Sequence, residues 1–366
     1  MRRNGGKEHT YRLLIIFLTV VLSFFLGGFI LLGAGLNPFR VYGHMISGIF
    51  SRPQFIAWSV TYATPIILTG LAVAFALQAS LFNIGVDGQF IMGTVATVAA
   101  GYFIKAPTLI HIPLALIAGI LGGALWAAIV GYLKVRHHLH EVVVSIMLNW
   151  IALYLCNFFT LLPAVNKPLS EASYSIQPEA SLQIHFLSQW LGPSTRVNWG
   201  ILIAVILAVI LHYVLHRTTF GFKLKAIGLN QDASLAAGMP MARIQFSSIT
   251  ISGAIAGLGG AVYVMGMLPH TVVSSVSDGY GFDGISVALI GLGEPVGVIF
   301  AGLFYGALKY SAGKLTSTGT PGELISIIIG CIVYFIAISN ALQIWIMQWR
   351  RKRIERNCQL QPREGN

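Results

Sequence analysis

The chain has 366 residues, of which 55% are hydrophobic and only 10% charged, and its formal net charge is +11. Soluble domains carry roughly 25% charged residues. This composition, with apolar runs of about 20 residues, argues against a soluble fold and indicates an all-α polytopic membrane protein. The basic residues lie beside the apolar runs, which favours membrane orientation over nucleic-acid binding, and three scattered cysteines argue against a disulfide framework.

Ten membrane spans are predicted, the eighth short enough for a half-helix. They cover residues 13–36, 56–78, 82–104, 112–133, 141–162, 198–216, 245–268, 282–293, 295–313 and 322–348. With the N-terminus inside, 16 of the 23 basic residues fall on the cytoplasmic side, so both termini are expected there. Residues 1–366 are thus read as one transmembrane domain, with a cytoplasmic N-terminus (1–12), inner loop (217–244) and tail (349–366).

Polar residues interrupt the third span in the stretch "SLFNIGVDGQFIMG", residues 80–93. A charge at the bilayer centre costs roughly 2.5–3.5 kcal/mol on insertion scales, so Asn83, Asp87 and Gln89 need an explanation. They either cap a broken helix or line a polar path between helices. A proton relay needs several linked acids or histidines, and only isolated ones are present, which disfavours ion coupling.

Further candidates lie in the fifth, seventh and eighth spans. Asn149 either joins two helices by hydrogen bonds or contacts a substrate. Tyr263 and Phe282 either stack on a planar substrate or pack in the protein or against lipid. The predicted substrate pathway consists of Phe82, Asn83, Asp87, Gln89, Asn149, Tyr263, Phe282 and Asp283.

The two parts of the chain show weak self-similarity at a shift of 182 to 183 residues. "LTGLAVA" (68–74) aligns with "ISGAIAG" (251–257), "AGILGGAL" (118–125) with "AGLFYGAL" (301–308), and "EVVVSIMLNWI" (141–151) with "ELISIIIGCIV" (323–333). The shift moves span 2 onto span 7, which is five spans further along the chain. A shift by an odd number of spans reverses the direction in which the chain crosses the membrane. Spans 2–5 and 7–10 are therefore predicted to be inverted repeats, which transporters use to enclose a site.

The inner loop contains the segment "NQDASLAAGM". Asn230 is a predicted N-cap, Asp232 lies in the first turn and Gly238 ends the helix. The resulting two-turn helix is either an interfacial amphipathic helix or a docking element for a cytoplasmic partner. No phosphate-binding G-x-x-x-x-G-K-[ST] sequence is present, and "HHLHE" (137–141) resembles a metal site only superficially, so no metal is expected.

Several of these stretches resemble the permease subunits of bacterial ABC importers for nucleosides and simple sugars. The matching motifs are "GLAVAFALQASLFNIGVDGQFIMG", "LHEVVVSIMLNWIALY", "TTFGFKLKAIGLNQDASLAAGM", "ISGAIAGLGGA" and "GFDGISVALIG". The combination of "FNIGVDGQ" with "HEVVVSIMLNWIA" is most similar to the nucleoside branch. The segment "LIGLGEPVG" departs from the expected pattern, which leaves the role of Glu294 open.

The resemblance implies a vitamin-B12-type (type II) importer fold in a bacterial cytoplasmic membrane, in contact with lipid. It implies three partners: a separate ATPase subunit that binds ATP and Mg²⁺, an extracytoplasmic substrate-binding lipoprotein, and a second, paralogous permease. No catalytic residue and no cofactor are expected on this chain. The alternatives are a permease for sugars such as ribose or galactose, and an ion-coupled secondary transporter. The implied ATPase contact comprises Gly228, Asn230, Gln231, Asp232, Ala233, Ala236, Ala237 and Gly238.

Overall fold

The computed structural model describes residues 21–22, 24–192, 195–316, 326–331 and 334. Contacts divide the chain into two compact units. One is Ile46–Ser311, and the other combines Met1–Met45 with Ala312–Asn366. The predicted cytoplasmic segments 1–12 and 349–366 lie outside the described residues, as does most of the predicted span 322–348.

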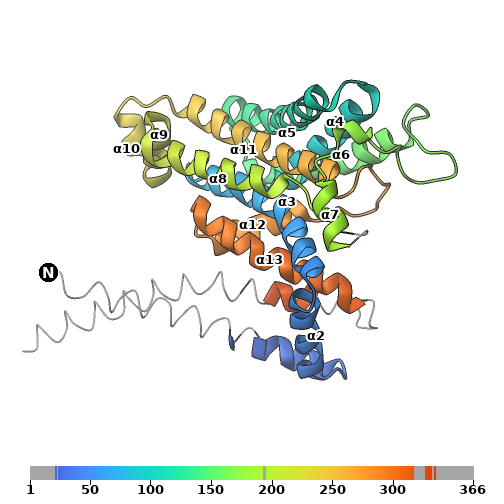
Figure 1. The fold of residues 1–366 in the computed structure, drawn as a ribbon. Coiled ribbons are helices and arrows are strands. Elements are labelled where there is room, and N and C mark those ends of the chain that lie inside the picture. The colour runs from blue at the N-terminus through green and yellow to red at the C-terminus, as the bar shows by residue number, and fades with distance from the viewer. Residues whose placement is uncertain (1–20, 23, 193–194, 317–325, 332–333, 335–366) are drawn as a thin grey trace, which may run out of the picture. The chain divides into compact units, whose positions relative to one another are not determined.

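The described part of the chain is helical, with only isolated β-bridges between loops. Its helices are α2 (Pro38–Phe50), α3 (Pro53–Leu77), α4 (Val86–Phe103), α5 (Thr108–His137), α6 (Glu141–Leu161), η1 (Pro178–Ala180), α7 (His185–Leu191), α8 (Gly200–Arg217), α9 (Thr219–Leu229), α10 (Gln231–Ala236), α11 (Met241–Gly266), α12 (Tyr280–Ile290) and α13 (Pro295–Thr316). Helices α9 and α10 lie beyond one end of α8 and α11, and α7 lies near the other end (Figure 1).

Six described helices are long and apolar enough to cross a membrane: α3, α5, α6, α8, α11 and α13. Helix α4 begins at Val86 rather than at the predicted residue 82, because the preceding residues form a non-helical connection to α3. Helix α12 is short, as expected of a half-helix, and ends at Ile290 in a tight turn. The all-helical membrane class is confirmed, while the count of ten spans stays a prediction.

Helices α3 and α11 form the centre of the larger unit and are the most buried of the long helices. Helix α3 packs against α11 and α12, and α11 packs against α3, α4 and α5. In the predicted repeats, α3 and α4 are the first two helices of one half, and α11 and α12 are the first two of the other. The first helix of each half therefore packs against the second helix of the other half, α3 against α12 and α11 against α4. This reciprocal arrangement is what a pseudo-twofold relation between the halves would produce.

Small residues let α5 and α11 approach closely. Gly119 and Gly123 on α5 face Gly253 and Gly257 on α11, both pairs at a spacing of four. A Cβ added at Gly123 would lie only 2.6 Å from the Cα of Gly257. Such small-residue pairs let two backbones come into direct van der Waals contact within a membrane, and here they fix α5 to the central helix.

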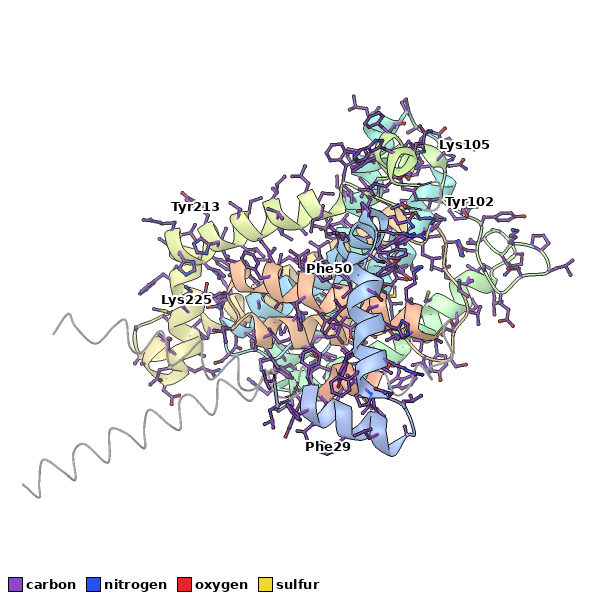
Figure 2. All side chains as sticks on the ribbon, turned by 60° about the horizontal axis from the view of Figure 1, so that its bottom comes forward. Phe29, Phe50, Tyr102, Lys105, Tyr213 and Lys225 are labelled. Atoms are coloured by element: carbon purple, nitrogen blue, oxygen red, sulfur yellow. The ribbon has the colours of Figure 1, made fainter. Side chains whose placement is uncertain are left out.

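Helices α5, α6 and α8 are less buried than the central helices and present many apolar side chains outward. Tyr213 on α8 is one of them and points away from the helices (Figure 2). Large exposed apolar surface on so many helices fits contact with lipid or with another membrane protein.

The connection between α6 and α8 packs across the ends of α4 and α11. Leu182 N–H donates to Met265 O at 2.9 Å, and Gln177 N–H donates to Gly101 O at 2.9 Å. The Arg196 guanidinium donates to Met267 O at 2.5 Å. The first two bonds satisfy carbonyl groups in the last turns of α11 and α4, which have no partner within their own helices.

The smaller unit contains a described helix, Phe24–Gly33, within the predicted first span. The Tyr42 hydroxyl donates to Phe24 O at 2.7 Å, and the two rings make an edge contact at 5.2 Å between centroids. This unit also holds a cavity of about 280 Å³ lined almost wholly by apolar side chains, a lining that suits lipid chains.

Candidate functional site

The interruption between α3 and α4 is built around two buried amides. Asn83 Nδ2 donates to Gln89 Oε1 at 2.9 Å, and Gln89 Nε2 donates back to Asn83 Oδ1 at 3.1 Å. Asn83 Nδ2 also donates to Ser252 Oγ on α11 at 2.8 Å. Asn83 is 3% exposed and Gln89 is fully buried, so these amides bind one another and α11.

Asn149 on α6 satisfies backbone groups that the interruption leaves free. Its Oδ1 accepts the Gly88 N–H at 2.9 Å, and its Nδ2 donates to Ile84 O at 3.0 Å. A Cβ added at Gly88 would lie 2.8 Å from Asn149 Oδ1, so the residue at position 88 must be small. Of the two predicted roles, the structure shows the interhelical hydrogen bonds.

Asp87 joins the N-termini of α4 and α12. It lies in the first turn of α4, and its Oδ1 accepts the N–H of Gly281, in the first turn of α12, at 3.0 Å. Among the described residues no lysine, arginine or histidine forms an ion pair with it. The positive ends of two helix dipoles stabilise a carboxylate here, each by about 0.3–1 kcal/mol and more where it is partly buried. Asp87 therefore caps a broken span, but the capped helix is α12.

Asp283 has a different environment. Its Oδ2 pairs with Lys309 Nζ on α13 at 2.5 Å, and its Oδ1 accepts a hydrogen bond from Tyr305 Oη at 2.5 Å. The Lys309 ammonium also lies 3.8 Å from the centre of the Tyr280 ring. Phe282, which directly precedes Asp283 in the sequence, is 48% exposed. Asp283 thus fixes α12 to α13, and its charge is neutralised locally.

Two rings of an aromatic cluster line a cavity beside α4 and α11. The rings of Phe90, Tyr263 and Tyr280 lie 4.9–5.6 Å apart between centroids. The cavity measures about 330 Å³, and Phe90 and Tyr263 line it together with Asp278. Tyr263 Oη donates to Asp278 Oδ2 at 3.1 Å. Small-molecule sites have this size and this mixture of aromatic surface with a few polar groups.

The rest of this aromatic cavity is lined by α4, α6 and the loop between α11 and α12. Its hydroxyl groups come from Thr94, Thr271, Ser274 and Ser277. Asn157 on α6 holds the loop in place, because its Nδ2 donates to Ser274 O at 2.8 Å and its Oδ1 accepts the Ser274 N–H at 3.1 Å. The cavity therefore offers ring faces and neutral hydrogen-bonding groups together.

His270, also on this loop, is the one titratable imidazole at the aromatic cavity. Partial burial lowers the pKa of His270 below its ordinary value, and the positive charges of Arg196 and Lys167 lower it further. The neutral imidazole is therefore the form that the loop stabilises.

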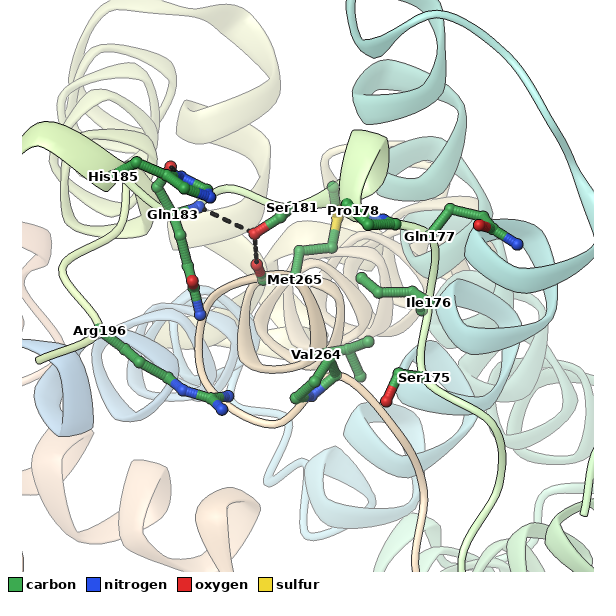
Figure 3. A pocket seen from close by; sticks show the side chains of 11 residues that line it. Ser175, Ile176, Gln177, Pro178, Ser181, Gln183, His185, Arg196, Val264 and Met265 are labelled. Carbon is green, nitrogen blue, oxygen red and sulfur yellow. Dashed lines mark hydrogen bonds between the residues drawn. The ribbon is translucent and has the colours of Figure 1, made fainter. Parts of the chain in front are cut away.

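A second cavity, of about 230 Å³, lies beneath the α6–α8 connection (Figure 3). The Ser181 hydroxyl accepts the Gln183 N–H at 3.2 Å and donates to Met265 O at 3.4 Å. Arg196 and His185 also line this cavity. Its polar groups come from the α6–α8 connection and not from the predicted pathway.

The predicted docking helix is present as α10. Asn230 Oδ1 accepts the Ala233 N–H at 3.0 Å, which is the expected N-cap bond, and Gly238 ends the helix with φ +73°. Leu235 is 63% exposed and the neighbouring alanines are exposed too. An apolar side chain left uncovered at the tip of a surface element is suited to contact another protein.

Gly228 does not lie on the docking helix. It belongs to the last turn of α9, a helix that the sequence did not predict, and packs against the residues that follow α3. Ser80 Oγ donates to Gly228 O at 2.8 Å. This contact connects the loop between α8 and α11 directly to the interruption before α4.

The structure brings the predicted pathway residues into separate places. Asn83, Gln89 and Asn149 gather at the start of α4, Asp87 contacts α12, and only Tyr263 lines the aromatic cavity. Sequence reasoning missed Phe90, Asp278, Tyr280 and Lys309. Asp278 and Tyr280 lie in "DGYGFDG" (278–284), immediately before the predicted half-helix (282–293), and this position was the available signal.

Residues 55–337 match a family profile described as branched-chain amino acid transport system / permease component. The chain belongs to this permease family. The match confirms the family expected from the motifs, and with the apolar helices it identifies the permease as an integral membrane protein.

Three relatives resemble the permease over most of their length. The guanosine ABC transporter permease protein NupP of Bacillus subtilis (strain 168) is 38% identical over 341 residues, covering 93% of this chain and 97% of NupP. The nucleoside ABC transporter permease protein NupB of Lactococcus lactis subsp. cremoris (strain MG1363) is 33% identical, covering 93% and 94%. The glucose ABC transporter permease protein TsgB13 of Haloferax volcanii (strain DS2) is 29% identical, covering 88% and 86%.

Proposed function

We propose that this permease is the membrane-spanning subunit of an ATP-driven importer that moves nucleosides across a bacterial cytoplasmic membrane. The observation that carries the proposal is the similarity to NupP and NupB along nearly the whole chain. Both termini face the cytoplasm in this proposal, because most basic residues then lie on the inner side.

The aromatic cavity suits a nucleoside. A base has a planar face that stacks on rings such as Phe90 and Tyr263, and a ribose offers hydroxyl groups to Asp278 and the neighbouring serines and threonines. We place the cavity beside the translocation path. Phe82 and Phe282, which are at least partly exposed, face that path where two permeases meet.

The buried amides and Asp87 shape this path instead of binding the substrate. Their hydrogen-bonding groups contact α6, α11 and α12, and a free substrate would have to displace these bonds. Displacement would leave buried backbone groups unpaired at a cost of about 1–3 kcal/mol each. Asn83, Gln89, Asn149 and Asp87 therefore keep the half-helices positioned around the path.

Energy comes from a separate ATPase subunit, where ATP and Mg²⁺ bind. We propose that this subunit docks on α10 through Leu235 and the exposed residues Gln231, Asp232, Ala233, Ala236 and Ala237. Closure of the ATPase displaces α10, and the Ser80–Gly228 bond carries the movement to the start of α4. An extracytoplasmic lipoprotein delivers the substrate, and a second, paralogous permease completes the path.

The test is uptake by a strain that lacks its own nucleoside transport and expresses the complete transporter. Labelled adenosine and guanosine should accumulate, uptake should stop on ATP depletion, and it should survive a protonophore. Uptake that stops with the protonophore while ATP remains would instead support ion coupling and overturn the proposal.

A sugar is the second candidate substrate, favoured by the similarity to TsgB13. Ribose, galactose and glucose belong in the same uptake experiment as unlabelled competitors. Strong competition by a free sugar, with none by adenosine or guanosine, would assign the permease to sugar import.

A further inference from the structure

Three potential metal ligands meet where α8 approaches the turn between α12 and α13. His212 and His216 lie one helical turn apart on α8, and Glu294 precedes α13. One ligand atom from each of the three lies within 4.8 Å of the others, and all three residues are exposed. Tyr213, next to His212 in sequence, marks this part of α8 in Figure 2.

The hydrogen bonding of His216 determines which ring nitrogen is available. Its Nδ1 lies 2.9 Å from His212 O. A carbonyl oxygen only accepts, so Nδ1 carries the proton and a neutral His216 has its lone pair on Nε2. Metal-binding histidines are commonly oriented in this way, by donating the other ring N–H to a carbonyl group.

The free nitrogen of His216 faces the Glu294 carboxylate. Nε2 lies 3.7 Å from Glu294 Oε2, which is too long for a direct hydrogen bond. When His216 is neutral, its Nε2 lone pair and the carboxylate oxygen repel each other, and a cation between them removes this repulsion. Two ligands held at about 2.0–2.1 Å from a tetrahedral Zn²⁺ stand roughly 3.4 Å apart, so a small side-chain adjustment would bring both into range.

The backbone that carries Glu294 is held in place. Gln78 Nε2, just after α3, donates to Gly293 O at 2.9 Å. Leu292 and Gly293 both have positive φ, +61° and +67°, so the turn has a defined conformation. One ligand lies on an anchored turn and the other two lie on one helix face. Binding of an ion therefore costs little conformational entropy.

We propose that His212, His216 and Glu294 bind a divalent transition metal ion of the Zn²⁺ type, with water completing the coordination. Two imidazoles and one carboxylate are ligands that Zn²⁺ takes at sites open to water. The bound ion links α8, just before the inner loop, to the α12–α13 turn. This site does not depend on which solute the permease carries.

The test uses the full chain, purified without a polyhistidine tag, and Zn²⁺ as the probe in titration calorimetry. Wild type should bind one ion. His216→Ala and Glu294→Gln should each weaken binding by at least about tenfold, a loss that even outer-shell changes cause at metal sites. His137→Ala is the matched control, because it removes an exposed histidine outside the cluster, and should bind as wild type does.

Co²⁺ provides a second measurement that is independent of folding changes, since its visible absorption reports the coordination geometry. A tetrahedral or five-coordinate spectrum that disappears in Glu294→Gln supports the site. Binding that is unchanged in His216→Ala and Glu294→Gln overturns the proposal, as does a wild-type protein that binds no ion. A loss of binding in His137→Ala alone would also overturn it.

Discussion

Replacing Asn149 by leucine tests whether the start of α4 depends on this side chain. The change removes an acceptor from the Gly88 N–H and a donor from Ile84 O, at bonds of 2.9 and 3.0 Å. Each buried group left unpaired costs about 1–3 kcal/mol, or about 2–6 kcal/mol together. Leucine adds apolar contact worth about 1 kcal/mol, so we expect a net loss of about 1–5 kcal/mol.

This loss is a large fraction of the total free energy of folding, which is about 5–15 kcal/mol for native proteins. The assay heats the purified full chain in detergent and measures, at each temperature, the fraction of protein that remains monodisperse. Trp150→Leu is the control, because the neighbouring Trp150 is 51% exposed and forms no such bonds. If Asn149→Leu unfolds at the wild-type temperature, or if Trp150→Leu is equally destabilised, the reasoning about α4 is wrong.

Four further predictions follow from contacts described above. Gly257→Ala should destabilise the chain by about 1–3 kcal/mol through overpacking, whereas Gly313→Ala, which has open space around it, should be neutral or stabilising in the same unfolding assay. Asp87→Asn should reduce uptake but preserve copurification with the ATPase, and loss of the complex would show that Asp87 is needed for assembly and not only for shaping the path. Leu235→Asp should weaken that copurification without changing which solutes compete, and an unaffected complex would remove α10 from the interface. Because the folded state lowers the pKa of His270, the unfolded state binds more protons just below pH 6.5. Stability should then rise as pH increases towards 6.5, and His270→Gln should reduce that slope; an unchanged slope would show that another group is responsible.

Local chemistry explains what the sequence could predict. The long apolar runs predicted α3, α5, α6, α8 and α11, because each run is long enough to span a bilayer. Asn230 predicted the start of α10, because an N-cap bond forms between residues only three apart. The interruption around Asp87 was also evident, since a charge and glycines stand between apolar runs.

Partners that come from distant elements could not be predicted in the same way. Asp283 was predicted as a pathway residue, but its pairing with Lys309 depends on how α12 and α13 fold against each other. The bond from Asp87 to Gly281 joins residues 194 apart in sequence. Glu294 had no predicted role because its neighbours, His212 and His216, come from a helix much earlier in the chain.

The close contact between α11 and α5 has a consequence for biosynthesis. Helix α11 has its closest approach to α5, which is made well before it. A ribosome-bound fragment ending before α11 would expose the Gly119–Gly123 strip of bare backbone to lipid. Helices that are inserted early therefore reach their final packing only after α11 has been made. A gene split between α8 and α9 should yield folded protein only when both fragments are produced in the same cell.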